Sequence, residues 1–281
     1  MLTASQLKSL LATHGLRLTK RLGQHHLIDP RMIQRIVESA QLSPQDTVVE
    51  IGAGLGALTE PLAERAGYVI AVEVDRRISA LLAERLAGMR HTEVAHEDIL
   101  SFNWGRARGA IVVGAIPYQV TSPIIVSLCE QRGHIPRAIL IIQEEVAQRF
   151  VAKPGAKTYG RLSVLGQYCW EIRMLFRVPR SAFFPQPAVD SSCVEFTARP
   201  QPAVRVDDEA VFFRVVKAAF AQRRKTLVNC LSAEHDQLVD RAEAEALVRH
   251  LDLPETVRGE TLSLDQFAAL ANALARSNSL R

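Results

Sequence analysis

Runs rich in valine and isoleucine alternate with amphipathic stretches through the first half of the chain. The expected strands are residues 47–52, 68–75, 92–98, 109–114 and 137–143, and the expected helices are residues 4–13, 29–40, 57–66, 76–87, 121–132 and 144–152. Strands that are apolar along their whole length are buried on both faces, as in parallel sheets covered by helices. The alternation therefore predicts an α/β fold with a doubly wound, mostly parallel sheet. Residues 161–168 and 193–197 add further strand or helix.

The pattern changes near Arg199. A proline-containing link over residues 198–204 leads into segments with helical spacing only, at residues 208–221, 223–232, 241–250 and 264–276. A chain of 281 residues has room for about two domains. We expect an α/β domain over residues 1–199 and a small all-helical domain over residues 200–281.

The composition excludes several classes of protein. The four cysteines form no C-x-x-C pair, which favours reduced, buried thiols in a cytoplasmic protein over a disulfide scaffold or a zinc site. The histidines show no metal-ligand spacing. The N-terminal stretch is too polar for a signal peptide, and no apolar run reaches the roughly 18 residues of a membrane span. We therefore expect a cytoplasmic protein with no metal site and no membrane segment.

A glycine-rich turn follows the first strand of the expected sheet. Gly52, Gly54 and Gly56 stand at alternate positions between that strand and the next helix. Ligands of open α/β sheets bind at the carboxyl ends of the strands, and glycine lets the backbone approach a ligand closely. This turn is a candidate binding site, although a tight turn alone would also explain it.

Two acidic residues end the next two strands. A carboxylate at Glu73 can accept both hydroxyls of a ribose, and Asp98 stands where an adenine edge would lie. Each acid also has a purely structural alternative: Glu73 as a hydrogen-bonded surface residue, and Asp98 as a helix cap. Together with the turn, these acids predict a cofactor that contains a nucleoside.

Two kinds of nucleoside cofactor share this geometry. A dinucleotide site uses G-x-G-x-x-G so that a pyrophosphate rests on a helix N-terminus, and Ala57 stands where that pattern has its third glycine. Glu50, two residues before Gly52, is a poor neighbour for a pyrophosphate but suits the cationic methionine part of S-adenosylmethionine. The turn alone leaves both cofactors open.

Residues 112–119 read V-V-G-A-I-P-Y-Q and place an aromatic residue just past the end of a strand. Pro117 restricts the backbone before Tyr118, so that the ring is a suitable platform for a flat ligand.

At this stretch the sequence resembles the ribosomal small-subunit RNA adenine dimethyltransferases, which use S-adenosylmethionine to place two methyls on each of two adjacent adenines near the 3′ end of that RNA. The resemblance covers essentially the whole chain. Its blocks are G-Q-H-H-L-I-D (23–29), E-I-G-A-G-L-G-A-L-T (50–59), A-I-P-Y-Q-V-T-S-P-I (115–124), Q-E-E-V-A-Q-R (143–149), K-T-Y-G-R-L-S-V (157–164), F-F-P-Q-P-A-V-D-S (183–191) and Q-R-R-K-T-L (222–227). It implies a Rossmann-like methyltransferase domain, a helical RNA-binding domain, and a monomer that acts on the immature small subunit.

The resemblance also implies which residues hold the cofactor. They are His25 and Leu27 on its methionine and ribose side, Gly52 and Gly54 beneath it, Glu73 at its ribose, Asp98 at its adenine and Ala115 beside its methyl group.

For the target adenine, the resemblance implies the following residues at the end of the strand. Tyr118 stacks on the base, and Phe183 closes the pocket. The adenine amine is a poor nucleophile, so its methylation needs placement and stabilisation of positive charge rather than a strong base. In the family pattern the residue at position 115 and the Ile116 carbonyl accept hydrogen bonds from the amine, with Pro117 keeping the backbone rigid.

Two positions depart from the family, which usually has Asn at both. His25 is a mild change because imidazole still donates or accepts one hydrogen bond. Ala115 has no side-chain acceptor, and losing one such partner costs about 3–4 kcal/mol of transition-state stabilisation, or roughly 10²–10³ in rate. A water molecule in the vacated space would replace part of the loss. We expect a slow or water-assisted enzyme, the alternative being a catalytically silent assembly factor.

Basic residues gather in two groups. One group precedes the cofactor loop and consists of Lys8, Arg17, Lys20 and Arg21; the other, in the helical part, consists of Arg214, Lys217, Arg223, Arg224 and Lys225. A solvated charged face is the ordinary alternative. Because Arg223, Arg224 and Lys225 fall inside a block that matches the family, we expect them to position RNA without reading bases.

Two further enzymatic alternatives remain open. One is methylation of large-subunit RNA, which the Q-R-R-K-T-L block disfavours. The other is a nicotinamide-dependent dehydrogenase, which leaves the I-P-Y stretch and the basic residues unexplained.

Overall fold

The computed structural model describes residues 2–16, 25–233 and 238–279. Contacts group the chain into two compact units, Met1–Ala147 with Glu171–Ala198, and Gln148–Trp170 with Arg199–Arg281. The division after Ala198 lies next to the expected boundary. Residues 148–170, however, group with the helical unit, which corrects the continuous first domain expected over residues 1–199. The physical reason is that Tyr168 packs on Phe212 of the helical unit, with ring centroids 4.5 Å apart.

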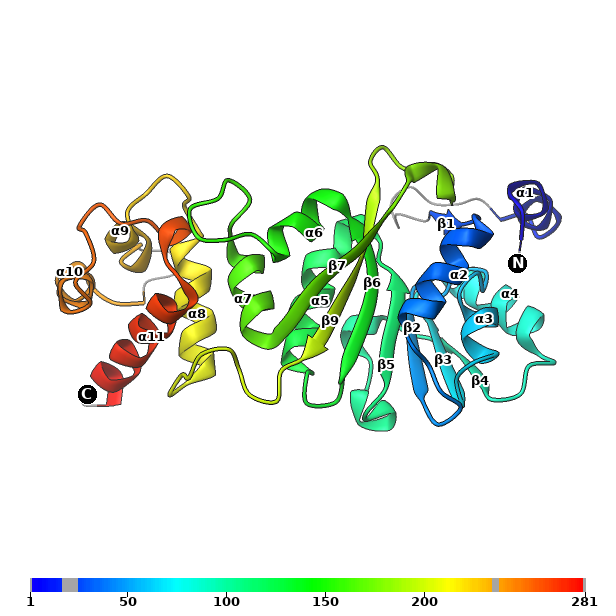
Figure 1. The fold of residues 1–281 in the computed structure, drawn as a ribbon, viewed down its shortest axis with the longest axis horizontal. Helices are drawn as coiled ribbons and strands as arrows, with labels where there is room; N and C mark the ends of the chain where they lie inside the picture. Colours follow the sequence, from blue (N-terminus) through cyan, green and yellow to red (C-terminus); the bar gives the residue numbers. More distant parts are fainter. Residues whose placement is uncertain (1, 17–24, 234–237, 280–281) are drawn as a thin grey trace. The chain divides into compact units, whose positions relative to one another are not determined.

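The first unit is built on a sheet that has seven strands in the described residues, in the order β4-β3-β2-β5-β6-β9-β7 (Figure 1). The strands are β2 (Thr47–Ile51), β3 (Tyr68–Glu73), β4 (Thr92–His96), β5 (Ile111–Ala115), β6 (Arg137–Gln143), β7 (Trp170–Val178) and β9 (Ser191–Ala198). The strands from β4 to β6 pair in parallel, and β9 pairs with β6 in the antiparallel direction. The predicted mostly parallel, doubly wound sheet is confirmed.

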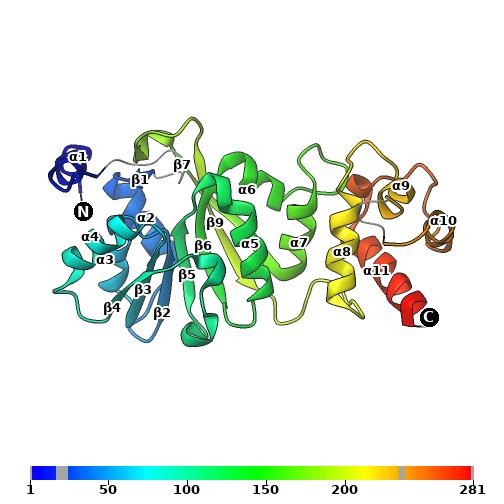
Figure 2. The same cartoon turned by 180° about the vertical axis from the view of Figure 1, so that it is seen from behind.

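Helices cover both faces of this sheet, which is why its strands are apolar throughout. Val48 and Val49 of β2 point to opposite faces, and both are fully buried. One face packs against α2 (Pro30–Ser39), α3 (Thr59–Ala63) and α4 (Arg76–Leu86). The helix α5 (Thr121–Glu130) lies in front of the sheet in Figure 2 and behind it in Figure 1.

The strand order reverses between β2 and β5. The chain runs outward from β2 through β3 to β4, and then returns to β5 on the other side of β2. Ligands of open α/β sheets bind at the carboxyl ends of the strands where the order reverses. Ile51 pairs with Gly114, so the glycine turn after β2 and the A-I-P-Y stretch at the end of β5 lie side by side there.

A short antiparallel ribbon lies apart from the main sheet. It pairs β1 (His26–Leu27) with β8 (Phe183–Phe184), so that two distant sequence motifs come together. The N-terminal helix α1 (Ala4–Thr13) is capped by Thr3 and buries Leu7 and Leu11 beside the glycine turn. The sequence did not predict this ribbon.

The second unit is helical, as predicted for residues 200–281. Its helices are α7 (Arg161–Cys169), α8 (Glu209–Ala219), α9 (Leu227–Leu231), α10 (Arg241–His250) and α11 (Leu264–Ser279), while α6 (Glu144–Phe150) contains the division between the units. Phe212 and Phe267 are fully buried in its core. The helix expected from residue 223 begins only at Leu227, because the Thr226 hydroxyl accepts from a backbone N–H and caps it there.

Further features of the described residues concern membrane helices, metal sites and cysteines. In that part of the chain, no helix has the length and apolar character needed to cross a bilayer. No group of His, Cys, Asp or Glu there has the arrangement of a metal site. All four cysteines are buried.

Candidate active site

The glycine turn after β2 depends on backbone angles that favour glycine. Gly52, Gly54 and Gly56 have φ values of +70°, +57° and +88°. A Cβ atom on Gly54 would lie 2.9 Å from the His26 ring, which is closer than side chains approach. Gly54 N–H donates to the Glu73 carboxylate at 2.9 Å. The turn is therefore folded back on the end of β3 and presents its backbone at the switch point.

The Glu73 carboxylate is buried at the end of β3 and is held by backbone amides. Gly54 and Asp75 each donate to one of its oxygens at 2.9 Å. Burial raises the pKa of Glu73, and these hydrogen bonds oppose the rise. A carboxylate has about four lone pairs, and the backbone N–H groups of Gly54, Asp75 and Val74 occupy three, so Glu73 can still accept from a ribose hydroxyl. The ribose contact stays a prediction.

The charge of Glu50 differs from the one that the sequence suggested. Its side chain is buried against Thr59, whose hydroxyl donates to it at 2.5 Å. The pKa of Glu50 is raised to about 8, chiefly by burial and to a smaller extent by Glu73, while the Thr59 hydrogen bond opposes the rise. Glu50 is thus mostly protonated at neutral pH and does not present a negative charge to a cationic ligand.

A cleft of about 200 Å³ opens at the carboxyl ends of β2 and β3. Its lining includes Gly52, Asp98, Val74, Leu100, Pro117 and Val120. Val74, Leu100 and Val120 are 52 %, 45 % and 37 % exposed, although large apolar side chains are normally buried. Exposed apolar walls with a few polar groups are typical of a site for a flat ring such as adenine.

Asp98 caps a short helix at the rim of this cleft. One carboxylate oxygen accepts from Leu100 N–H at 3.0 Å and caps the short helix Ile99–Ser101. The residue is exposed and lines the cleft, so it is placed to meet an adenine edge. The adenine contact itself stays a prediction.

A smaller pocket of about 20 Å³ lies at the end of β5. All five residues predicted for the target base line it, namely Ala115, Ile116, Pro117, Tyr118 and Phe183. Pro117 also lines the cleft, so the cleft and the pocket share a wall. The Ile116 N–H donates to the Ile141 carbonyl at 3.0 Å, which fixes the peptide next to Ala115. These five residues therefore lie together at one pocket, and their roles toward a target base stay predictions.

Ser191 is a pocket residue to which the sequence assigned no role. Its buried hydroxyl lies 2.9 Å from the Tyr118 hydroxyl. Burial raises the pKa of Tyr118, and the Ser191 hydrogen bond lowers it. The contact holds the tyrosine ring in place at its far end. The only available signal was that Ser191 closes the F-F-P-Q-P-A-V-D-S block.

His25 lies in this smaller pocket rather than in the cleft. Its Nδ1 is 2.6 Å from the Pro185 carbonyl oxygen, and its ring stacks on Tyr118 with centroids 5.8 Å apart. Its predicted contact with the cofactor stays a prediction.

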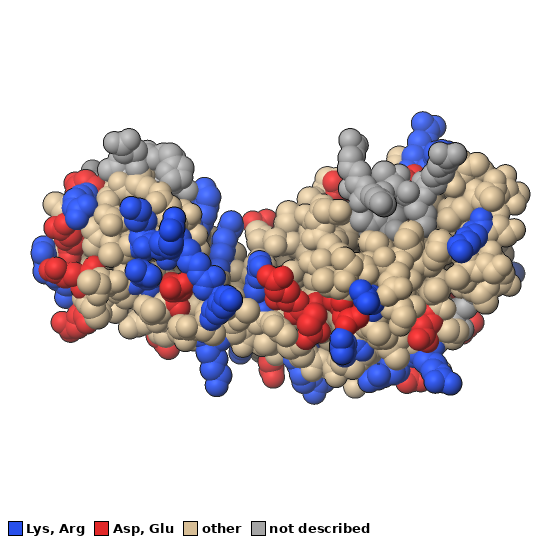
Figure 3. All heavy atoms as spheres, turned by 90° about the horizontal axis from the view of Figure 1, so that it is seen from above, with Lys and Arg blue, Asp and Glu red and all other residues tan. Residues whose placement is uncertain are grey.

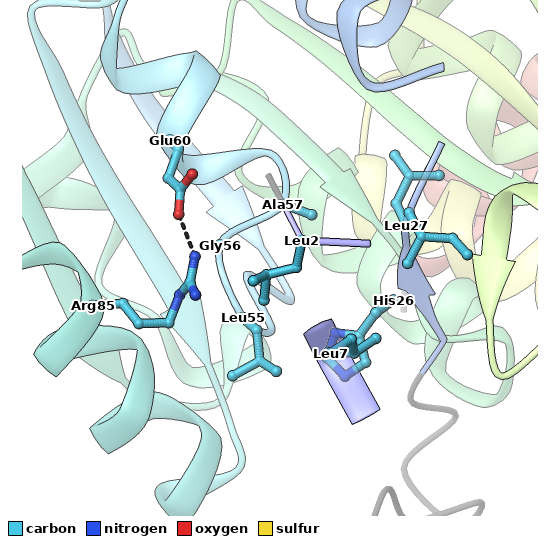
Figure 4. A pocket seen from close by; sticks show the side chains of 10 residues that line it. Leu2, Leu7, His26, Leu27, Leu55, Gly56, Ala57, Glu60 and Arg85 are labelled. Carbon is cyan, nitrogen blue, oxygen red and sulfur yellow. Dashed lines mark hydrogen bonds and ion pairs between the residues drawn. The ribbon is translucent and has the colours of Figure 1, made fainter. Parts of the chain in front are cut away.

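The outer side of the glycine turn is closed by α1 and β1 (Figure 4). A cavity of only about 10 Å³ remains there, and Leu7, Leu27 and His26 line it. Burial, together with a smaller effect of the neighbouring His25, lowers the pKa of His26 to about 4. The His26 ring is thus neutral and packs as an apolar group. Leu27 is buried at this position, and its predicted cofactor contact is likewise untested.

The predicted RNA-binding residues lie in a turn of the second unit and not on a helix. Arg223, Arg224 and Lys225 are exposed between α8 and α9, and Lys and Arg side chains gather on this unit in Figure 3. Arg223 is held by Glu260 at 2.6 Å and by the Lys157 carbonyl. In the other basic group, Arg17, Lys20 and Arg21 lie outside the described residues.

A doubly wound sheet whose switch point carries a nucleoside-sized cleft and an adjoining aromatic pocket defines a Rossmann-like protein with a candidate nucleoside site. The family model "Ribosomal RNA adenine dimethylase" matches residues 15–276. A ribosomal RNA small subunit methyltransferase A from Bacillus cytotoxicus is 41 % identical, over 97 % of this chain and 96 % of its own length. The protein of that name from Geobacillus thermodenitrificans is 42 % identical, over 97 % and 96 %. The chain therefore belongs to the ribosomal RNA adenine dimethylase family.

Solved structures agree with this assignment. A dimethyladenosine transferase from Plasmodium falciparum is 25 % identical with a TM-score of 0.77, over 90 % of this chain and 98 % of its own. The 23S rRNA methyltransferase ErmE is 29 % identical with a TM-score of 0.64, over 89 % and 99 %. The chain is accordingly a methyltransferase.

Proposed function

We propose that this enzyme uses S-adenosylmethionine to dimethylate two adjacent adenines near the 3′ end of small-subunit ribosomal RNA, during assembly of the subunit in the cytoplasm. The observation that carries the proposal is the pocket in which all five predicted target residues meet, sharing Pro117 with the cleft. The curated relatives are named for the small subunit, which supports that subunit over the large one.

The residues of the cleft fit the proposed cofactor. Val74 and Leu100 are apolar surfaces for an adenine ring, with Asp98 at its edge. Glu73 keeps a lone pair for a ribose hydroxyl, and Gly52 has a φ of +70°, a backbone conformation that favours glycine. When bound, S-adenosylmethionine supplies an activated methyl group on a positively charged sulfur.

The residues of the smaller pocket position the target base. Tyr118 offers a ring held by Ser191, and Phe183 is buried on the β8 strand at the pocket wall. The family resemblance implies that the Ile116 carbonyl accepts a hydrogen bond from the amine. An adenine inside a duplex does not reach such a site, so the target is single-stranded or flipped out. The pocket has a volume of only about 20 Å³, and it must widen to admit a base.

The basic turn of the second unit binds the RNA backbone in this proposal. Arg224 and Lys225 are exposed and can contact phosphates, and Arg223 stabilises the turn through its ion pair with Glu260. Contacts of this kind position RNA without selecting sequence, and they weaken with salt. The protein acts as a monomer on the immature subunit.

The experiment compares methyl transfer from labelled S-adenosylmethionine to unmethylated small subunits and to large-subunit RNA. We expect incorporation into small subunits by the natural protein, and a rate about 10²–10³ higher for Ala115→Asn if no other group replaces the missing acceptor. Stabilisation against thermal unfolding by S-adenosylhomocysteine, but not by NAD, is expected from the cleft. No incorporation by the natural protein, with clear incorporation by Ala115→Asn, would support the silent assembly factor instead.

A further inference from the structure

The pocket beside Ala115 holds few side-chain acceptors for a target amine. Five of its eight lining residues have no polar side-chain atom, namely Ala115, Ile116, Pro117, Ile141 and Phe183. Tyr118 and Ser191 direct their hydroxyls at each other, 2.9 Å apart. The eighth lining residue is His25, whose imidazole carries two nitrogens. Among the described residues that line the pocket, His25 is therefore the strongest candidate acceptor.

One contact determines which nitrogen of His25 carries the proton. Nδ1 lies 2.6 Å from the Pro185 carbonyl oxygen, and a carbonyl can only accept a hydrogen bond. Nδ1 must therefore donate, and in the neutral ring Nε2 then keeps its lone pair. His25 and Pro185 directly flank the paired strands β1 and β8, so the backbone holds the two partners together. The neutral ring is thus fixed as an acceptor at Nε2.

The orientation of the ring also suits an amine. The His25 and Tyr118 rings are inclined by 29°, with centroids 5.8 Å apart. Because stacked planes lie about 3.5–4 Å apart, the imidazole is displaced sideways from the tyrosine centre by roughly 4–5 Å. An adenine lying flat on Tyr118 beside the imidazole would be inclined to the imidazole plane by the same 29°. The Nε2 lone pair lies in the imidazole plane and the amine N–H bonds lie in the adenine plane, so a hydrogen bond between the two edges needs only a modest bend.

We propose that His25 Nε2 accepts a hydrogen bond from the target amine and so supplies the acceptor that the side chain of Ala115 lacks. The proposal rests on the proposed function, since it requires an adenine in this pocket. It gives a common reason for the departures from the family pattern at positions 25 and 115. The acceptor stabilises the positive charge that develops on the amine nitrogen.

A double-mutant cycle on methyl transfer to unmethylated small subunits tests this exchange. In the natural background, His25→Leu is expected to lower kcat by about 10²-fold. In the Ala115→Asn background the same change is expected to cost less than about 10-fold, because Asn supplies the acceptor. His250→Leu, which removes an exposed imidazole on α10, is the matched control and is expected to leave kcat unchanged.

Two measurements keep the test independent of folding and of cofactor binding. Calorimetry with S-adenosylhomocysteine is expected to give affinities within about 3-fold for all variants, because His25 lines the pocket and not the cleft. Long-range ¹H–¹⁵N spectra, assigned by comparison with His25→Leu, are expected to show the proton on Nδ1, which an unconstrained histidine disfavours.

The possible outcomes separate the two proposals. Equal losses for His25→Leu in both backgrounds, loss of S-adenosylhomocysteine binding, or a proton on Nε2 would overturn the role of His25 while leaving the methyltransferase intact. Activity seen only with Asn at position 115 would overturn it as well. A natural protein and an Ala115→Asn variant that both fail to methylate small subunits would refute the proposed function and the role of His25 with it.

Discussion

Replacing Glu50 by glutamine is expected to stabilise the protein at and above neutral pH. Burial raises the pKa of Glu50 to about 8 in the folded chain, whereas a free glutamate side chain titrates near 4.5. Glutamine keeps a carbonyl acceptor for the Thr59 hydroxyl and never ionises. The substitution therefore removes a titration while preserving the hydrogen bond.

The sign and the size of the effect follow from proton binding. Between pH 4.5 and about 8 the folded chain holds a proton at Glu50 that the unfolded chain has released, so the free energy of unfolding falls as the pH rises. The contribution is fully present below pH 4.5 and is lost above about pH 8. At about 1.4 kcal/mol for each pKa unit, the loss over this window is about 3–5 kcal/mol.

Urea unfolding of the natural protein and Glu50→Gln at pH 5, 6, 7 and 8 measures the difference directly. The gap between them is expected to widen by about 3 kcal/mol or more from the lowest to the highest of these values. Other titrating groups are common to both proteins and cancel in the difference. Glu84→Gln on the exposed side of α4 controls for the change of charge alone. A gap that stays constant with pH would refute the argument that Glu50 is buried in its neutral form.

Other perturbations test other parts of the account. His26→Leu is expected to stabilise the protein by about 2 kcal/mol more at pH 5 than above pH 6.5. The reason is that the natural protein, whose buried His26 has a pKa of about 4, loses stability as the pH falls below 6.5. A difference in urea unfolding that does not change with pH would contradict this. Leu100→Asp on the cleft wall is expected to weaken S-adenosylhomocysteine binding by about 10-fold or more in calorimetry, since it puts a charge against the adenine, while the equally exposed Val189→Asp leaves it unchanged. Arg224→Ala and Lys225→Ala are each expected to reduce the slope of log affinity for RNA against log salt by about 0.7–0.9 in filter binding, and unchanged slopes would remove this turn from the RNA surface.

The sheet was predictable because strands that are buried on both faces are continuous apolar runs in the sequence. The run at residues 137–143 became β6 with the same bounds, and the helix at residues 4–13 became α1. The strand β7 and the ribbon of β1 and β8 were missed for different reasons. β7 (Trp170–Val178) is an edge strand with exposed positions, so it lacks a continuous apolar run. β1 and β8 have only two residues each, and their pairing depends on tertiary contacts.

The candidate site was predictable as a set of residues but not as a set of contacts. The position of Tyr118 after β5 follows from the local sequence, and its convergence with Phe183 came from the family resemblance. The Ser191 hydroxyl on Tyr118 joins residues 73 positions apart, and the Pro185 carbonyl on His25 joins residues 160 positions apart. Neither spacing has a periodic signal. The burial of Glu50 likewise depends on the packing of Thr59 from the following helix, which a strand pattern does not reveal.

The central claim is that this site dimethylates adenines of the small subunit. Its most direct test is mass spectrometry of nucleosides from unmethylated small subunits incubated with the natural protein and S-adenosylmethionine. We expect N6,N6-dimethyladenosine to approach two per subunit and to be confined to the 3′-terminal fragment of the RNA. Absence of dimethyladenosine after long incubation with protein that binds S-adenosylhomocysteine, or its appearance only in large-subunit RNA, would contradict the account.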